Sequence, residues 1–84
     1  MLYHIYTEDK PNLADLASKH FDGFTILKGV GYWQGEAEPC AVIEIIDSKD
    51  KWLTVNTLAL DIKEANKQQA VLITQISLDH NILV

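Results

Sequence analysis

The chain has 84 residues, 48% of them hydrophobic and 23% charged, and its 12 acidic and 7 basic side chains give a formal net charge of −5. This globular composition excludes a disordered chain. The acidic balance and the lack of a basic cluster exclude a binder of nucleic acid or of anionic membranes. Because a chain of this size buries only about 60–65% of its unfolded surface, we expect one domain over 1–84 that gains burial by forming a homo-oligomer, a dimer or a trimer.

The sequence carries no signal for a membrane, a metal or a cofactor. No apolar run reaches the roughly 18–20 residues that span a bilayer, and Met1–His4 begins without the regions of a signal peptide, so we expect a cytoplasmic protein. The single Cys40 excludes an internal disulfide and a zinc site of several cysteines. His20 and His80 have no metal-ligand spacing with each other or with Cys40, so we expect neither a metal nor a cofactor.

The first third of the chain predicts a strand, a helix and a second strand. Residues 2–7 are rich in β-formers and end at a polar segment with Pro11, which suits the end of a strand. Asn12 is a suitable helix cap, and one helical face follows it, formed by Leu13, Leu16, Ala17 and His20. Gly23 can take the left-handed conformation that closes a helix, so we expect this helix to stop at 21–23 and a strand to run over 24–34.

The rest of the chain predicts a hairpin, a long helix and a last strand. A turn over 35–39 leads to a run rich in β-branched residues over 40–46. We expect Asp47 to cap a helix that ends at a left-handed Asn66. Its apolar stripe consists of Trp52, Val55, Leu58, Ala59 and Ile62. A strand over 70–76 and a C-terminal tail over 77–84 follow, and the tail closes on the apolar residues 82–84.

The predicted order is strand, helix, strand, strand, helix, strand. Right-handed crossovers between these elements give a ferredoxin-like α+β fold. Its four antiparallel strands lie in the order 4-1-3-2, and both helices cover one face of the sheet.

Alternation along the strands assigns the side chains to two faces. We place the hairpin turn at Glu36-Ala37, with Gly35 opposite Glu38. The more apolar face then belongs under the helices and carries Tyr3, Ile5, Phe24, Ile26, Lys28, Val30, Tyr32, Ala41, Ile43 and Ile45. The face without helices carries His4, Tyr6, Leu27, Gly29, Gly31, Trp33, Cys40, Val42, Glu44, Ile46 and either Leu72 or Ile73. Such a mixture of apolar and ionisable groups is rare on a sheet exposed to water, so we predict that something covers it.

This helix-free face is the predicted interface or ligand surface, formed by Trp33, Gly29, Gly31, Cys40, Val42 and Glu44. Gly29 and Gly31 would let another backbone, an aromatic ring or a ligand approach closely. Alternatively, they mark a twist or a bulge of the strand. Since they lie within a strand and not at a strand-to-helix turn, they cannot cradle a phosphate in the usual way.

Three ionisable residues of the same face are candidates for catalysis: His4, Tyr6 and Glu44. A carboxylate in a central apolar strand needs a donor such as His4, Tyr6 or Lys28 to stay ionised. A His4–Glu44 pair would supply a general base and the group that orients it, with one ring nitrogen left for a substrate. Alternatively, the pair is a packed hydrogen bond or an interface contact.

The segment Gly23-Phe24-Thr25-Ile26-Leu27-Lys28-Gly29-Val30-Gly31-Tyr32-Trp33, with Ala41-Val42-Ile43-Glu44-Ile45-Ile46-Asp47 after it, resembles the PII-like superfamily of small trimeric signalling proteins. Those proteins also have a glycine-containing aliphatic second strand and an aliphatic third strand that ends in an acid. Their long loop between these strands shrinks here to residues 35–38, and Asn66-Lys67-Gln68-Gln69 replaces their glycine-rich nucleotide loop. The resemblance therefore implies the fold but no ATP sensing. The element order is also similar to that of dimeric α+β barrel proteins, some of which perform cofactor-free or haem chemistry.

These observations favour a small non-enzymatic oligomeric binding or regulatory module that uses its helix-free face toward a small molecule or a protein. One alternative is a cofactor-free enzyme of the dimeric α+β barrel type that uses His4, Tyr6 and Glu44. Another is an acidic inhibitor protein of a mobile element, for which a net charge of −5 is modest.

Overall fold

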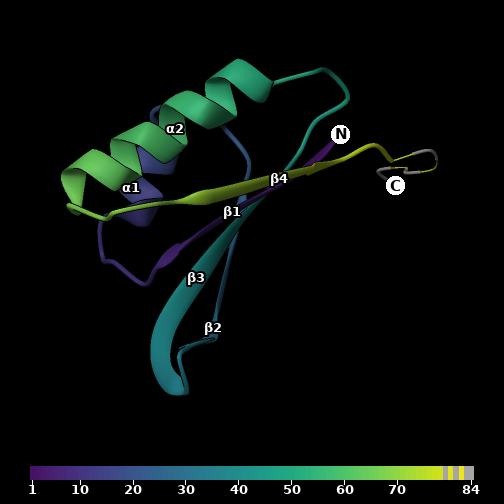
Figure 1. Cartoon of the computed structure of the whole chain (residues 1–84). Helices are drawn as coiled ribbons and strands as arrows, with labels where there is room; N and C mark the ends of the chain where they lie inside the picture. Colours follow the sequence, from purple (N-terminus) through teal and green to yellow (C-terminus); the bar gives the residue numbers. More distant parts are fainter. Residues whose placement is uncertain (79, 81, 83–84) are drawn as a thin grey trace.

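The computed structural model describes residues 1–78, 80 and 82. The elements are β1 (Leu2–Glu8), α1 (Leu13–Ser18), β2 (Thr25–Trp33), β3 (Glu36–Ile46), α2 (Trp52–Ala65) and β4 (Leu72–Ile76). Their order along the chain is the predicted one (Figure 1).

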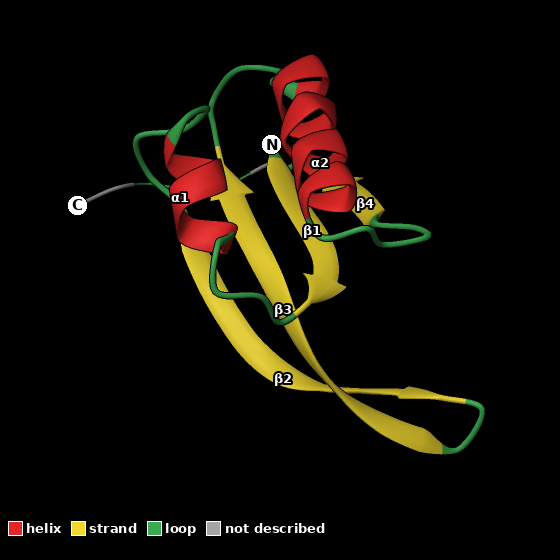
Figure 2. Ribbon diagram, turned by 90° about the vertical axis from the view of Figure 1, so that its left-hand side faces the viewer, coloured by secondary structure: helices red, strands yellow, loops and turns green. Residues whose placement is uncertain are grey.

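The four strands form one antiparallel sheet in the order β2-β3-β1-β4. This order is the predicted 4-1-3-2 read from the other edge, so the α+β class and the topology of the sheet are confirmed. Both helices lie on the same side of the sheet (Figure 2). No helix of the described residues covers the opposite side.

The core lies between the helices and one face of the sheet. Alternate residues of β1 and β3 are buried on this face: Tyr3, Ile5, Ala41, Ile43 and Ile45. From α2, the buried residues Val55, Leu58, Ala59 and Ile62 recur at helical spacing and pack in the same cluster, as do Leu13 and Ala17 of α1. Full burial of an aliphatic side chain stabilises the fold by about 1.5–3 kcal/mol. The burial of alternate residues confirms the predicted division of β1 and β3 into two faces.

The predicted position of the hairpin turn was wrong. The chain turns at Gln34-Gly35, with φ of 50° and 82°, and Trp33 lies opposite Glu36. Two successive positive φ angles are characteristic of the type I′ turn that connects twisted strands, and glycine adopts them without strain. The turn therefore falls where Gly35 can supply the left-handed residue, and not at Glu36-Ala37. Each side chain keeps its predicted face, but Gly29 lies opposite Cys40 instead of Glu44.

Helix ends also differ from the prediction. α1 stops at Ser18 and not at 21–23, and α2 begins at Trp52, so Asp47 does not cap it. The Asp47 Oδ1 atom instead accepts a hydrogen bond from the Lys49 N–H at 2.9 Å, and this contact forms a turn ahead of α2. The left-handed residue after α2 is Lys67 (φ 54°), one position beyond Asn66.

The distal part of the β2–β3 hairpin extends beyond both helices (Figure 2). β1 ends at Glu8 opposite Cys40, so residues 29–40, which we call the arm, form a two-stranded ribbon. Val30 and Tyr32 were expected to lie under the helices, but they are 61% and 76% exposed. Their strand alternation is right, whereas the helices are too short to cover them. Trp52, at the first turn of α2, is also exposed and not part of the core.

No helix within the described residues is long and apolar enough to cross a membrane. The predicted tail 77–84 includes residues 79, 81, 83 and 84, which lie outside the described residues; within it, Ile82 is exposed.

Candidate functional site

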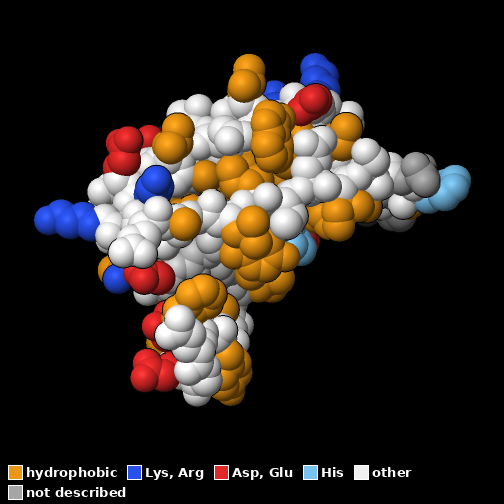
Figure 3. All heavy atoms as spheres, in the orientation of Figure 1, with side chains coloured by type: hydrophobic (Ala, Val, Ile, Leu, Met, Phe, Trp, Pro, Cys, Tyr) orange, Lys and Arg blue, Asp and Glu red, His pale blue; other side chains and the backbone are white. Residues whose placement is uncertain are grey.

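The helix-free face is built of rows of side chains that cross the four strands. Large hydrophobic side chains on it are exposed to solvent: Tyr6, Leu27, Trp33, Ile46, Leu72 and Ile76. Strand register places Leu72, Tyr6, Val42 and Leu27 in one row and Ile76, Leu2 and Ile46 in another. Leu72, and not Ile73, is thus the β4 residue on this face. Figure 3 shows hydrophobic side chains gathered below β4 and along the arm.

A polar row lies between these two apolar rows. His4 of β1 lies opposite Glu44 of β3 and Thr74 of β4. The His4 Nε2 atom is 2.8 Å from Glu44 Oε2, and the two side chains are 24% and 29% exposed. The His4 Nδ1 atom is 3.2 Å from the Tyr6 hydroxyl, which lies two residues further along β1. The structure therefore brings together the three residues that the sequence singled out as catalytic candidates.

Hydrogen-bond chemistry fixes the direction of this chain. The Glu44 carboxylate only accepts, so His4 donates from Nε2–H. A neutral imidazole then accepts at Nδ1, and the Tyr6 O–H donates to it. Both ring nitrogens therefore have a hydrogen-bond partner, and a substrate would reach the His4 Nδ1 atom by displacing Tyr6. The exposed end of the chain is the Tyr6 hydroxyl, because Tyr6 is 39% exposed.

The alternative donor for Glu44 was Lys28, and this pairing does not occur. Lys28 lies on the helix side of β2, and its Nζ is 3.4 Å from Asp9 Oδ1. Thr25 is the β2 residue opposite Glu44. The Glu44 carboxylate thus has His4 as its side-chain hydrogen-bond partner.

An open cleft of about 640 Å³ lies between the base of the arm and the loop that follows α2. Its lining includes Tyr6, Trp33, Cys40 and Leu72 of the helix-free face, together with residues 67–70. Gly31 also lines it. A Cβ added at Gly29 would lie 3.6 Å from Cys40 Sγ, an ordinary contact distance. The glycines are therefore not required by steric crowding, and close approach of a partner at these positions stays a prediction.

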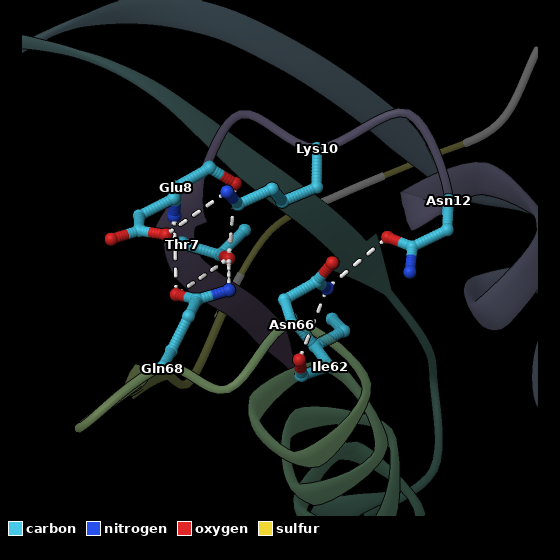
Figure 4. Close-up of polar contacts among 7 residues, drawn as sticks. All are labelled: Thr7, Glu8, Lys10, Asn12, Ile62, Asn66 and Gln68. Carbon is cyan, nitrogen blue, oxygen red and sulfur yellow. Dashed lines mark hydrogen bonds and ion pairs between the residues drawn. The ribbon is translucent and has the colours of Figure 1, made fainter.

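Two hydrogen-bonded contacts, which the sequence patterns did not reveal, hold one wall of the cleft (Figure 4). The buried Gln68 side chain donates to Thr7 Oγ1 at 2.8 Å and accepts from the Glu8 N–H at 3.3 Å. Asn66 Nδ2 donates to Asn12 Oδ1 at 3.1 Å, so Asn12 uses its side chain to join the two helices and not to cap α1. These contacts fix the loop after α2 against the end of β1. The sequence signal was limited to the amides at 66, 68 and 69, which are equally common in solvated loops.

His20 likewise has a structural role. Its Nε2 is 2.7 Å from Asp61 Oδ2, which joins the end of α1 to α2 on the side of the molecule opposite the helix-free face. His80 is exposed. Among the described residues, no three His, Cys, Asp or Glu side chains are grouped as metal ligands would be.

Comparison of the chain with protein-family models, with curated proteins and with solved structures gives no match. The function is therefore inferred from the geometry of the helix-free face.

Proposed function

We propose that the protein is a homo-oligomeric binding module without catalytic activity and that the helix-free face is its contact surface. The observation that carries this proposal is the set of large hydrophobic side chains on that face. Trp33 is 70% exposed, Leu72 59% and Ile46 56%. Several large apolar side chains exposed on one face of a sheet, here in rows on either side of a polar row, favour an interaction surface.

The exposed area supports self-association. The chain exposes 6092 Å². A compact monomer of its mass, 9.5 kDa, should expose about 5,000 Å². The surplus of about 1,000 Å² is close to the roughly 800 Å² that each partner buries in a standard interface. A second copy of the chain is thus a partner of suitable size.

Three further points belong to the proposal. The order of elements supports a ferredoxin-like arrangement of the domain. The free thiol of Cys40 suits a reducing, cytoplasmic setting. A regulatory role fits a module whose contact surface contains ionisable groups. A ligand that binds these groups can change whether a partner occupies the surface.

A second candidate function rests on the chain of hydrogen bonds Tyr6–His4–Glu44. In this version the protein is a cofactor-free enzyme in which Glu44 orients His4 and His4 accepts the proton of Tyr6. The non-catalytic proposal is favoured because it needs only the exposed apolar side chains of the helix-free face.

The proposal is tested by sedimentation of the wild type at micromolar concentrations and of the variant Leu72→Asp. We expect the wild type to sediment as a multiple of 9.5 kDa and the variant as a single chain. The matched control is Leu53→Asp, because Leu53 is 82% exposed on α2 and the substitution adds the same charge away from the helix-free face. Circular dichroism checks that both variants fold. A wild type that sediments as 9.5 kDa, or a control that dissociates like Leu72→Asp, would contradict the proposal.

A further inference from the structure

Within the described residues, no helix covers the side of the arm that faces away from the helix-free face. That side carries Val30, Tyr32, Ala37 and Pro39, and all four residues are exposed. We call this set the apolar side of the arm, since it contains no charged residue. A two-stranded ribbon alone is marginally stable in water, so an arm of this composition gains from a surface that covers it.

The other side of the arm is acidic. It continues the helix-free face and carries Glu36 and Glu38 beside Trp33, with Glu8 and Glu44 on the adjoining strands. If two copies paired face to face through this surface, carboxylates of both copies would be brought together in a chain whose net charge is already −5. Juxtaposed like charges disfavour such an interface.

The apolar side of the arm avoids this repulsion. When it lies on the helix-free face of another copy, it brings apolar residues to the row formed by Leu72, Tyr6, Val42 and Leu27. The carboxylates Glu36 and Glu38 of the same arm point away from that contact and stay in water. Gly29 and Gly31 carry no side chain on this face, so they would let a large side chain of the arm approach the backbone.

We propose that the protein assembles arm to face: the apolar side of the arm of one copy packs on the helix-free face of the next. This inference rests on the proposed self-association and adds the apolar side of the arm as the second contact surface. The interface is heterologous, because two different surfaces of the chain meet. Every copy then has one donor surface and one acceptor surface.

Mixing two defective variants tests this arrangement. Val30→Asp impairs the arm and leaves the helix-free face intact, whereas Leu72→Asp impairs the face and leaves the arm intact. We expect each variant alone to sediment at 9.5 kDa and an equimolar mixture to form a heterodimer of twice that mass, with one chain of each kind. Native mass spectrometry with one isotopically labelled variant identifies the heterodimer. Tyr32→Asp, on the same side of the arm, replaces Val30→Asp if that variant does not fold.

The outcomes separate this inference from the proposed function. If Val30→Asp and Tyr32→Asp assemble like the wild type while Leu72→Asp does not, the faces pair with each other and the arm-to-face arrangement is wrong. If both kinds of variant are single chains and their mixture stays so, the arms do not bind the intact faces, and the inference is also wrong. A wild type that is itself a single chain overturns the proposed function together with the inference.

Discussion

Replacing the His4–Glu44 pair by leucines measures what this hydrogen bond contributes. A hydrogen bond to a charged group contributes about 1.5–3 kcal/mol to stability when it is buried, and an exposed ion pair contributes about 0.2–1 kcal/mol. The His4 and Glu44 side chains are 24% and 29% exposed, so the contribution of their hydrogen bond to stability lies between these limits. We expect a coupling free energy of about 1 kcal/mol in the double-mutant cycle of His4→Leu and Glu44→Leu.

The double variant should be about as stable as the wild type, because leucines at these positions continue the apolar rows on either side. The assay is urea unfolding of the four proteins at one chain concentration, since dissociation contributes to the stability of an oligomer. The control cycle pairs His4→Leu with Glu38→Leu, which removes a carboxylate of the same face that His4 does not contact. A coupling for His4 and Glu44 no larger than that of the control cycle would refute the hydrogen bond.

NMR of the imidazole nitrogens should also show the Nε2–H form of neutral His4. The Nδ1–H form would contradict the direction assigned to the chain of hydrogen bonds.

Substitutions at three further places test other parts of the structure. Burial raises the pKa of the Tyr3 phenol above its ordinary value of 10.0, so the folded state holds this proton more tightly than the unfolded state. The contribution of this group to the free energy of unfolding should be complete below about pH 10 and be lost as the pH rises further, and Tyr3→Phe should remove that dependence in urea titrations. Gln68→Leu should lower the free energy of unfolding by about 1–3 kcal/mol, because the Thr7 hydroxyl and the Glu8 N–H lose their hydrogen bonds to the buried Gln68 side chain, whereas the exposed neighbour Gln69→Leu should change it by less than about 0.5 kcal/mol. Gly35→Ala should lower the melting temperature through its positive φ, at a cost of about 1 kcal/mol, and Gln34→Asn should raise it, because asparagine tolerates this conformation better; equal melting temperatures would place the turn elsewhere.

Local patterns in the sequence determined the type and order of the elements and the face of each residue in the first three strands, whereas the structure decided between Leu72 and Ile73 on β4. The period-two alternation of β1 and β3 and the helical repeat of Val55, Ala59 and Ile62 each reflect burial of one side, and the structure confirms both. Since His4 and Glu44 lie on the same face of neighbouring strands, the sequence could also propose them as a pair. Their contact at 2.8 Å follows from the register of β1 and β3.

The register of the β2–β3 hairpin and the ends of the helices depended on tertiary structure. A shift of the hairpin by two residues in each strand keeps every side chain on its face, so alternation cannot detect it; the turn at Gln34-Gly35 decides it. Helix length then determines which strand residues are covered, and the short α1 leaves Val30 and Tyr32 exposed on the arm. The tertiary contacts of Gln68 and Asn66 join segments more than 50 residues apart. Amide side chains bond equally well to water and to many protein groups, so only the folded chain specifies their partners.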